Sequence, residues 1–360
     1  MSVENSDISK NGFKQISKYR GAIMGFAALS ILFFHAWIPI TLEPDESKIY
    51  LISFLEHYFK KIGFLGVDIF FLLSGIGLTF SIKKGSTLKF YYRRIRRIIL
   101  PFFAVGIIRG IIQNWGIATI IGNLSGYNFY TKDVNSFLWF IPAIITLYLI
   151  FPLYYRIFCR FNNKVLFTII VITIWLIVSL IVSDTMRKDL FGFTNRIPIF
   201  VIGILFGFIM QNKKEIVFNF KIYLLLAIVL LTGFYLAYLT TIQGMELIVP
   251  IGNCFLPNLL IATSLSFLLA KLFDMLERRL PKTGKIVNKT LGFFGMISLE
   301  LYCVQSWFVD IIELLLNDGW SKHIINISLF LIVTATSWVA YVVFRSFWEL
   351  VEIPFKHHKT

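Results

Sequence analysis

Long apolar runs separated by short basic segments most constrain how this chain of 360 residues can fold. A helix needs about 20 apolar residues to cross a bilayer, and hydrophobic residues make up 57% of this chain, against roughly 45–50% in soluble domains. We therefore predict an all-α polytopic membrane protein with about ten transmembrane helices. The expected spans are residues 21–40, 62–82, 98–121, 137–157, 165–183, 196–211, 222–241, 249–272, 291–316 and 324–345.

The basic residues indicate which ends of the spans face the cytoplasm. Most of the 35 Lys and Arg residues lie between alternate pairs of spans, as in residues 83–97 and 271–289. The positive-inside bias places such segments in the cytoplasm, so both termini are expected there. The predicted organisation is a cytoplasmic segment 1–20, a membrane domain 21–345 and a cytoplasmic tail 346–360.

The same bias accounts for the net charge of +15 without a nucleic-acid partner. Membrane lipids are the expected surroundings, in a cell membrane and most simply a bacterial plasma membrane. Oligomeric state cannot be predicted from these patterns. The three cysteines, Cys159, Cys254 and Cys303, lack the spacing of a metal site or a disulfide framework, and no metal is expected.

Two small-residue spacings predict close contacts between helices. Gly21 and Gly25 are four residues apart in the first run, and Gly203 and Gly207 are four apart in the sixth. Small side chains at this spacing let two helix backbones approach each other.

His35 and Asp68 are the first candidates for chemistry. His35 lies about 14 residues past the inner end of the first run, roughly 21 Å along a helix. Asp68 lies near the outer end of the second run, at a matching depth. Ionisable groups inside a membrane are costly and often functional, so we predict that the two pair as a general base. The alternative is a purely structural hydrogen bond.

A dense arginine cluster follows the second run. Arg93, Arg94, Arg96 and Arg97 lie between Lys89 and Pro101. Helical spacing places several guanidiniums on one face, and arginine suits bidentate phosphate binding. Anchoring of the topology by anionic lipid explains the same cluster, and spacing does not choose between the two.

Further polar residues lie at membrane depth in the later runs. Arg109 must face protein or a water-filled cavity, either against Glu300 or against a ligand. The segment from Ser298 to Gln305 places several polar groups, including Tyr302, on one helix wall, where they are expected to line a cavity. Arg196 begins the sixth run and either meets anionic or sugar groups or extends toward the interface.

With these residues identified, the chain resembles the membrane-bound acyltransferase 3 family, which moves acyl groups, usually acetyl, onto glycans and other extracytoplasmic acceptors. The stronger similarities are the helix ending Leu32-Phe33-Phe34-His35-Ala36, the segment Gly66-Val67-Asp68 to Ser74-Gly75, the Arg-rich stretch Phe90 to Pro101, and Leu138-Trp139-Phe140 followed by Tyr148 and Pro152. Weaker similarities are Arg196-Ile197-Pro198 with Gly203, and Gly295 to Tyr302.

The resemblance implies roles for residues of this chain. His35 corresponds to the catalytic histidine and Asp68 to the acid beside it. Residues expected on the acyl-CoA side are Arg93, Arg94, Arg96, Arg97, Arg20, Arg109 and Ser74, and those expected near the acceptor are Trp139, Glu300, Tyr302 and Arg196.

Two positions depart from the family pattern. The family usually has a basic residue eleven positions before its histidine, where this chain has Met24. Arg20 lies one helical turn further inward, only about 40° away in azimuth, and can serve the same face. Gln305 stands where family members often have a second histidine.

The predicted function is therefore transfer of an acyl group, most simply acetyl, from cytoplasmic acyl-CoA to a hydroxyl of a cell-surface glycan or its lipid-linked precursor. His35 acts as general base or is itself briefly acylated. The alternative is a transporter or flippase of lipid-linked sugars that uses Arg109, Glu300 and Asp310 as a polar path and needs no CoA.

Overall fold

The computed structural model describes residues 11–41, 51–132, 138–182, 190–212, 216–245, 255–309 and 311–356. The ends of the two predicted cytoplasmic segments, residues 1–10 and 357–360, lie outside this part, as do Cys254 and Asp310. The described residues are mostly helical and form no strand beyond an isolated bridge between Asn11 and Val217. The all-α prediction is confirmed.

The helices of the first half surround the predicted histidine and arginine motifs. They are α2 (Gly12–Ala36), α3 (Leu51–Ile62), the 3-10 turn η1 (Gly63–Leu65), α4 (Gly66–Ile82), α5 (Thr87–Ile112), α6 (Ile117–Leu124), α7 (Tyr127–Thr131), α8 (Phe140–Arg160) and α9 (Lys164–Val182).

The helices of the second half complete the bundle. They are α10 (Phe191–Thr194), α11 (Ile197–Gln211), α12 (Phe220–Thr241), α13 (Phe255–Arg279), α14 (Pro281–Met296), α15 (Ser298–Phe308), α16 (Ile311–Asn317) and α17 (Lys322–Lys356).

Eight helical segments in the described part of the chain are long and apolar enough to cross a membrane, and each corresponds to one of the ten predicted spans. The other two predictions, 98–121 and 291–316, are wrong as single helices. The first is interrupted after Ile112, where Asn114 has φ 52° and the chain turns into α6. The second is divided into α14, α15 and α16. Hydropathy did not reveal these breaks because the residues on both sides remain apolar.

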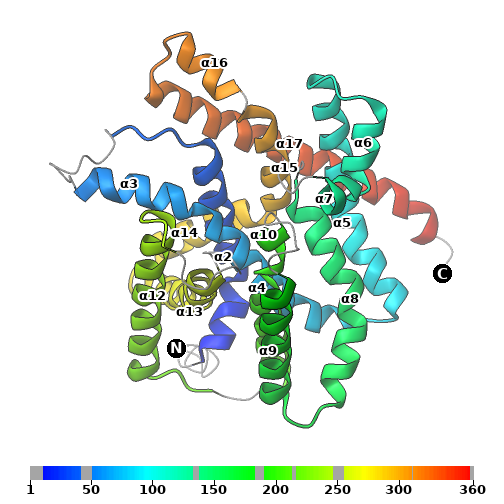
Figure 1. The fold of residues 1–360 in the computed structure, drawn as a ribbon, viewed down its shortest axis with the longest axis vertical. Helices are drawn as coiled ribbons and strands as arrows, with labels where there is room; N and C mark the ends of the chain where they lie inside the picture. The colour runs from blue at the N-terminus through cyan, green and yellow to red at the C-terminus, as the bar shows by residue number, and fades with distance from the viewer. Residues whose placement is uncertain are drawn as a thin grey trace.

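Helices α2 and α4 form the centre of the molecule (Figure 1). Helix α2 packs against α14, α13, α4 and α15, and α4 packs against α11, α2 and α13. The main apolar core contains residues from both helices, including Ile23 and Phe71, which are fully buried. The two segments with the strongest candidate residues therefore lie side by side inside the bundle.

The two predicted glycine contacts are present. A Cβ on Gly25 would overlap the carbonyl oxygen of Leu291 in α14, and a Cβ on Gly203 would overlap that of Leu72 in α4. Backbone-to-backbone packing of this kind requires glycine, because any side chain would push the helices apart. The crossings of α2 with α14 and of α4 with α11 thus fix the walls of the interior.

Both terminal helices extend beyond the predicted spans. Helix α2 begins at Gly12 rather than near residue 21, because the Asn11 side chain accepts hydrogen bonds from the backbone N–H groups of Phe13 and Lys14. Helix α17 continues to Lys356, past the predicted end at residue 345. Because of these additional turns, the helix beside the arginine cluster is longer than the sequence predicted.

Candidate active site

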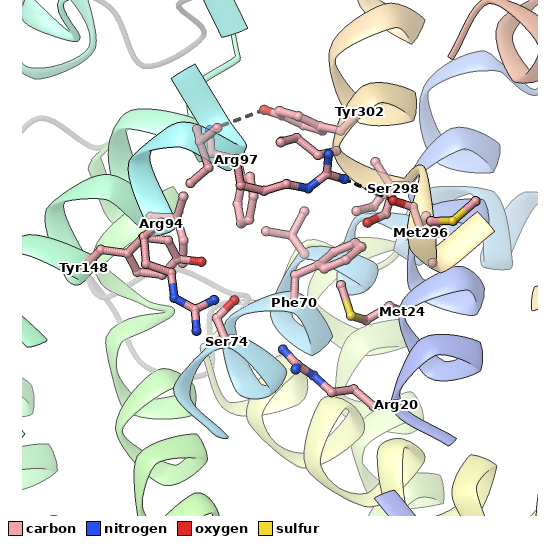
Figure 2. Close-up of a pocket in the computed structure, with 18 of the residues that line it drawn as sticks. Arg20, Met24, Phe70, Ser74, Arg94, Arg97, Tyr148, Met296, Ser298 and Tyr302 are labelled. Atoms are coloured by element: carbon pink, nitrogen blue, oxygen red, sulfur yellow. Dashed lines mark hydrogen bonds between the residues drawn. The ribbon is translucent and has the colours of Figure 1, made fainter. Parts of the chain in front are cut away.

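A cavity of about 280 Å³ lies among α2, α4, α5, α8, α14 and α15 (Figure 2). It brings together predicted residues from distant parts of the chain. The predicted residues that line it are Arg20, Ser74, Arg94, Arg97 and Tyr302. The polar segment of α15, predicted to line a cavity, does so through Ser298, Tyr302 and Gln305.

Arg20 and Met24 share one face of α2, as their spacing predicted. Both line the cavity, followed on the same face by Ala28 and Ile31. The Arg20 guanidinium donates to the carbonyl oxygen of Leu73 at 3.3 Å. It can approach α4 because a Cβ on Gly77 would stand 2.6 Å from the Arg20 Nη2 atom. The Ser74-Gly75-Ile76-Gly77 segment is thus the place where an arginine reaches the backbone of α4.

Arg93 and Arg94 donate hydrogen bonds to backbone carbonyl oxygens rather than to carboxylates. Arg93 donates to the carbonyl oxygens of Ser81 at 2.9 Å and Lys84 at 3.2 Å, and Arg94 donates to that of Gly77 at 3.5 Å. Cations are favoured near a helix C-terminus because the carbonyls there carry partial negative charge. Within the described residues neither guanidinium forms an ion pair, so each retains capacity for an anion.

Arg97 forms a bidentate ion pair with Glu300. The two N–O distances are 2.5 and 3.0 Å, and Arg97 also donates to the carbonyl oxygen of Met296. The Glu300 side chain is fully buried whereas that of Arg97 is 44% exposed. Of the two alternatives for Arg109, the pairing with Glu300 is not found among the described residues: Glu300 pairs with Arg97, and Arg109 donates to the Ser306 carbonyl.

Neither Arg96 nor Arg109 lines the first cavity. The Arg96 guanidinium lies over the ring of Tyr92 at 5.7 Å, on a different side of α5 from Arg94 and Arg97. Arg109 lies further along α5, where its guanidinium ties α5 to α15. Arg109 does not line this cavity, and its predicted part in donor binding stays a prediction.

A second cavity, of about 400 Å³, adjoins the first at the basic end of α5. Arg94, Arg97, Ile98 and Tyr148 line both cavities. Arg93 and Arg96 line the second one, opposite residues of α17. All four arginines of the predicted cluster therefore line the second cavity, and two of them, Arg94 and Arg97, form part of the wall between it and the first cavity.

Asp68 is buried in a cluster of its own rather than paired with His35. Its carboxylate lies 3.3 Å from the Arg196 guanidinium and accepts a hydrogen bond from the Asn258 amide at 3.1 Å. The side chains of Asp68 and Arg196 are 1% and 7% exposed. Arg196 in turn lies over the ring of Trp139 at 5.2 Å. Among the described residues no hydrogen bond joins Asp68 to His35, which corrects the predicted pair.

The position of Asp68 on its helix explains this result. Val67, Phe70 and Ser74 form the cavity-lining face of α4. Asp68 is one residue beyond Val67 and is therefore rotated by about 100° from it. The carboxylate consequently points toward α11 and α13, where it neutralises a buried arginine.

Removing the Asp68 carboxylate should destabilise the bundle. Asp68→Ala leaves the Arg196 charge buried without its partner, and losing one partner of a buried ion pair costs about 3–5 kcal/mol. Thermal unfolding of the purified protein in detergent should show a clearly lower Tm. Glu313→Ala, which removes an exposed carboxylate of α16, should leave Tm nearly unchanged. Equal Tm values for both variants would contradict a stabilising role of Asp68.

His35 lies in the last turn of α2, four residues after Ile31 of the cavity wall. Four residues correspond to about one turn, or roughly 6 Å along the helix, with an offset of only about 40°. The imidazole therefore continues the cavity-lining face beyond the cavity. Its side chain is exposed and stands edge-on to Phe34, with ring centroids 4.8 Å apart.

The segment that follows His35 is held by two side chains from other helices. Glu56 of α3 accepts hydrogen bonds from the Trp37 indole and from the backbone N–H groups of Ile40 and Thr41, at 2.8–2.9 Å. Asn326 of α17 hydrogen-bonds both the N–H and the carbonyl of Ile38. These contacts fix the end of α2 and with it the position of His35. Sequence reasoning missed both residues, because neither stands in a recognisable motif.

Tyr302 and Trp139 lie where α15 meets the start of α8. The Tyr302 hydroxyl accepts a hydrogen bond from the Phe140 N–H at 3.3 Å, at the start of α8. Trp139 directly precedes this helix and follows Leu138, whose φ of 54° lies in a region that few non-glycine residues adopt. The Leu138-Trp139-Phe140 segment thus connects Tyr302 to the Arg196–Asp68 pair.

The comparison with known protein families agrees with this arrangement. Residues 23–342 match the model of the acyltransferase 3 family, described as an acyltransferase domain. The chain belongs to the acyltransferase 3 family. Neither the curated proteins nor the solved structures gave a significant match.

Membership in the acyltransferase 3 family makes the chain a multi-pass membrane protein of acyltransferase type. The matched residues include the cavity-lining residues from Met24 to Tyr341, together with His35 and the Asp68 cluster, whereas Arg20 precedes the match. The last residues of the second cavity, from Phe344 to Glu349, lie beyond the match.

Proposed function

We propose that the protein transfers an acyl group, most simply acetyl, from acyl-CoA to a hydroxyl of an extracytoplasmic acceptor such as a cell-surface glycan or its lipid-linked precursor. The donor enters at the basic end of α5, which the positive-inside bias assigns to the cytoplasm. The acceptor approaches His35 at the opposite end of α2. The reaction takes place at His35, one helical turn beyond the cavity wall at Ile31.

The observation that carries the proposal is the pair of adjacent cavities that share Arg94, Arg97, Ile98 and Tyr148 as lining residues. Acyl-CoA has an anionic nucleotide end and a long, weakly polar pantetheine arm. We call the second cavity, at the basic end of α5, the outer cavity and the first cavity the inner cavity. The basic outer cavity suits the phosphates, since guanidiniums form strong charge-assisted hydrogen bonds with them. The inner cavity has an apolar surface between Met24 and Phe70 and polar groups from Ser74, Ser298 and Tyr302, so it suits the weakly polar arm and the thioester.

The chemistry at His35 follows from its place above the cavity. The imidazole accepts the proton of the acceptor hydroxyl, whose oxygen attacks the thioester carbonyl, and CoA leaves as a thiolate. Alternatively the imidazole attacks first and passes the acyl group on. In both routes Asp68 acts at a distance, because it neutralises Arg196. We therefore assign Asp68 and Arg196 to positioning α4, α11 and Trp139 around the site.

Membranes containing the protein should transfer label from radiolabelled acetyl-CoA to an endogenous acceptor, with release of free CoA. Membranes prepared without the protein are the control, since they contain the same lipids and glycans. Movement of lipid-linked sugars across the bilayer without consumption of acetyl-CoA would instead favour a flippase. Absence of both label transfer and CoA release would contradict the proposed function.

A further inference from the structure

The cytoplasmic end of α17 presents one aromatic and charged face to the arginine cluster. Tyr341, Phe344, Arg345 and Trp348 are spaced three and four residues apart, so they lie on one side of the helix, and all four line the outer cavity. The opposite side consists of exposed apolar residues. These are Val339, Val342, Val343, Phe347 and Leu350, each at least 42% exposed.

This face meets the arginines directly. The Arg97 guanidinium lies over the Tyr341 ring at 5.4 Å, so α17 is docked on α5 at the place where the two cavities join. Arg345 adds a fifth guanidinium to the outer cavity and is held by Glu349 at 2.9 Å. Phe344 and Trp348 expose ring surface to the same space.

The composition of this wall indicates what the cavity is suited to bind. Arginines alone would serve any phosphate, including a lipid headgroup. Aromatic rings set among guanidiniums add a surface on which a nucleobase stacks, and such stacking contributes substantially to binding. The outer cavity thus combines recognition of phosphates with recognition of a flat ring.

We propose that residues 341–349 of α17 form the adenine-nucleotide wall of the donor site, with Trp348 stacking on the base and Arg345 joining Arg93 and Arg96 at the phosphates. The inference rests on the proposed use of acyl-CoA and assigns a part of the chain beyond the family match to donor recognition. The C-terminal helix is then a component of the site rather than a tail.

The test measures binding of tritiated CoA to the purified full-length protein and its competition by adenosine 3′,5′-bisphosphate, which has the nucleotide but not the pantetheine arm. Trp348→Ala should weaken binding of both ligands by about 10-fold, in line with the loss of one base–aromatic stack. Trp348→Phe should retain most of the affinity. Trp338→Ala is the matched control, because this tryptophan of the same helix is 50% exposed and lines neither cavity.

The outcomes separate the two proposals. Failure of the wild-type protein to bind CoA would overturn the proposed donor and this wall together. Normal CoA binding that Trp348→Ala leaves unchanged, while Tm is also unchanged, would overturn the wall alone. Inorganic pyrophosphate competing as well as the adenine nucleotide would show a phosphate or lipid-headgroup site without base recognition, which also contradicts the wall.

Discussion

His35→Ala should abolish acyl transfer in membranes while leaving expression and CoA binding largely intact. A positioned general base contributes about 10²- to 10⁴-fold to the rate, so at least about 99% of the activity should be lost. Affinity for CoA should persist because His35 lies one turn outside the cavity wall that ends at Ile31. Label transfer from acetyl-CoA and CoA binding, measured on the same membranes, check the two parts of this expectation.

His57→Ala is the matched control for this variant. His57 is partly buried in α3, and among the described residues its ring hydrogen-bonds the Ser53 carbonyl of its own helix. Its replacement removes an imidazole near the end of α2 without touching the cavity wall, and activity should remain. Full activity of His35→Ala would remove His35 from the mechanism. Loss of CoA binding in this variant would show that His35 acts in donor binding rather than in transfer.

The spans and glycine crossings were predictable because they depend on local sequence. Apolar length and the four-residue spacing of glycines are read along one helix, and the eight candidate spans and the α2–α14 contact follow from them. The division of residues 291–316 was not predictable, because the break at Ile297 is made by fully buried, apolar packing. Hydropathy carries no signal for a helix end that is satisfied by its neighbours.

The partners of buried charges were the least predictable feature. Equal depth suggested pairing Asp68 with His35 and Glu300 with Arg109, but depth along a helix leaves the azimuth open. Asp68 faces α11 and α13, where Arg196 lies, and Glu300 faces the segment of α5 that carries Arg97. Which neighbouring helix a side chain faces depends on how several helices cross, so its partner is defined only in the packed bundle. The face of Arg20 was predictable because it depends only on residue spacing within α2, and Arg20 lines the cavity together with Met24 as expected.

Two substitutions at the junction of the cavities should shift CoA affinity in opposite directions. Arg94→Met should weaken CoA binding, and Glu300→Gln should strengthen it. Arg94→Met removes a guanidinium that lines both cavities and has no carboxylate partner within the described residues. Hydrogen bonds to charged groups contribute about 1.5–3 kcal/mol, so CoA should bind about 10- to 100-fold more weakly. Arg160→Met removes an exposed arginine from the end of α8, outside both cavities, and should leave the affinity unchanged.

Glu300→Gln is expected to shift CoA affinity in the opposite direction. The amide keeps the shape of the buried side chain and one acceptor for Arg97, but it no longer neutralises that guanidinium. The junction then carries one more positive charge, so CoA should bind several-fold more tightly at low ionic strength, and the gain should shrink as salt is added. A cluster that only anchors the topology predicts no change in CoA affinity for either variant. Opposite shifts in Arg94→Met and Glu300→Gln would therefore show that the anionic donor binds within electrostatic range of both side chains.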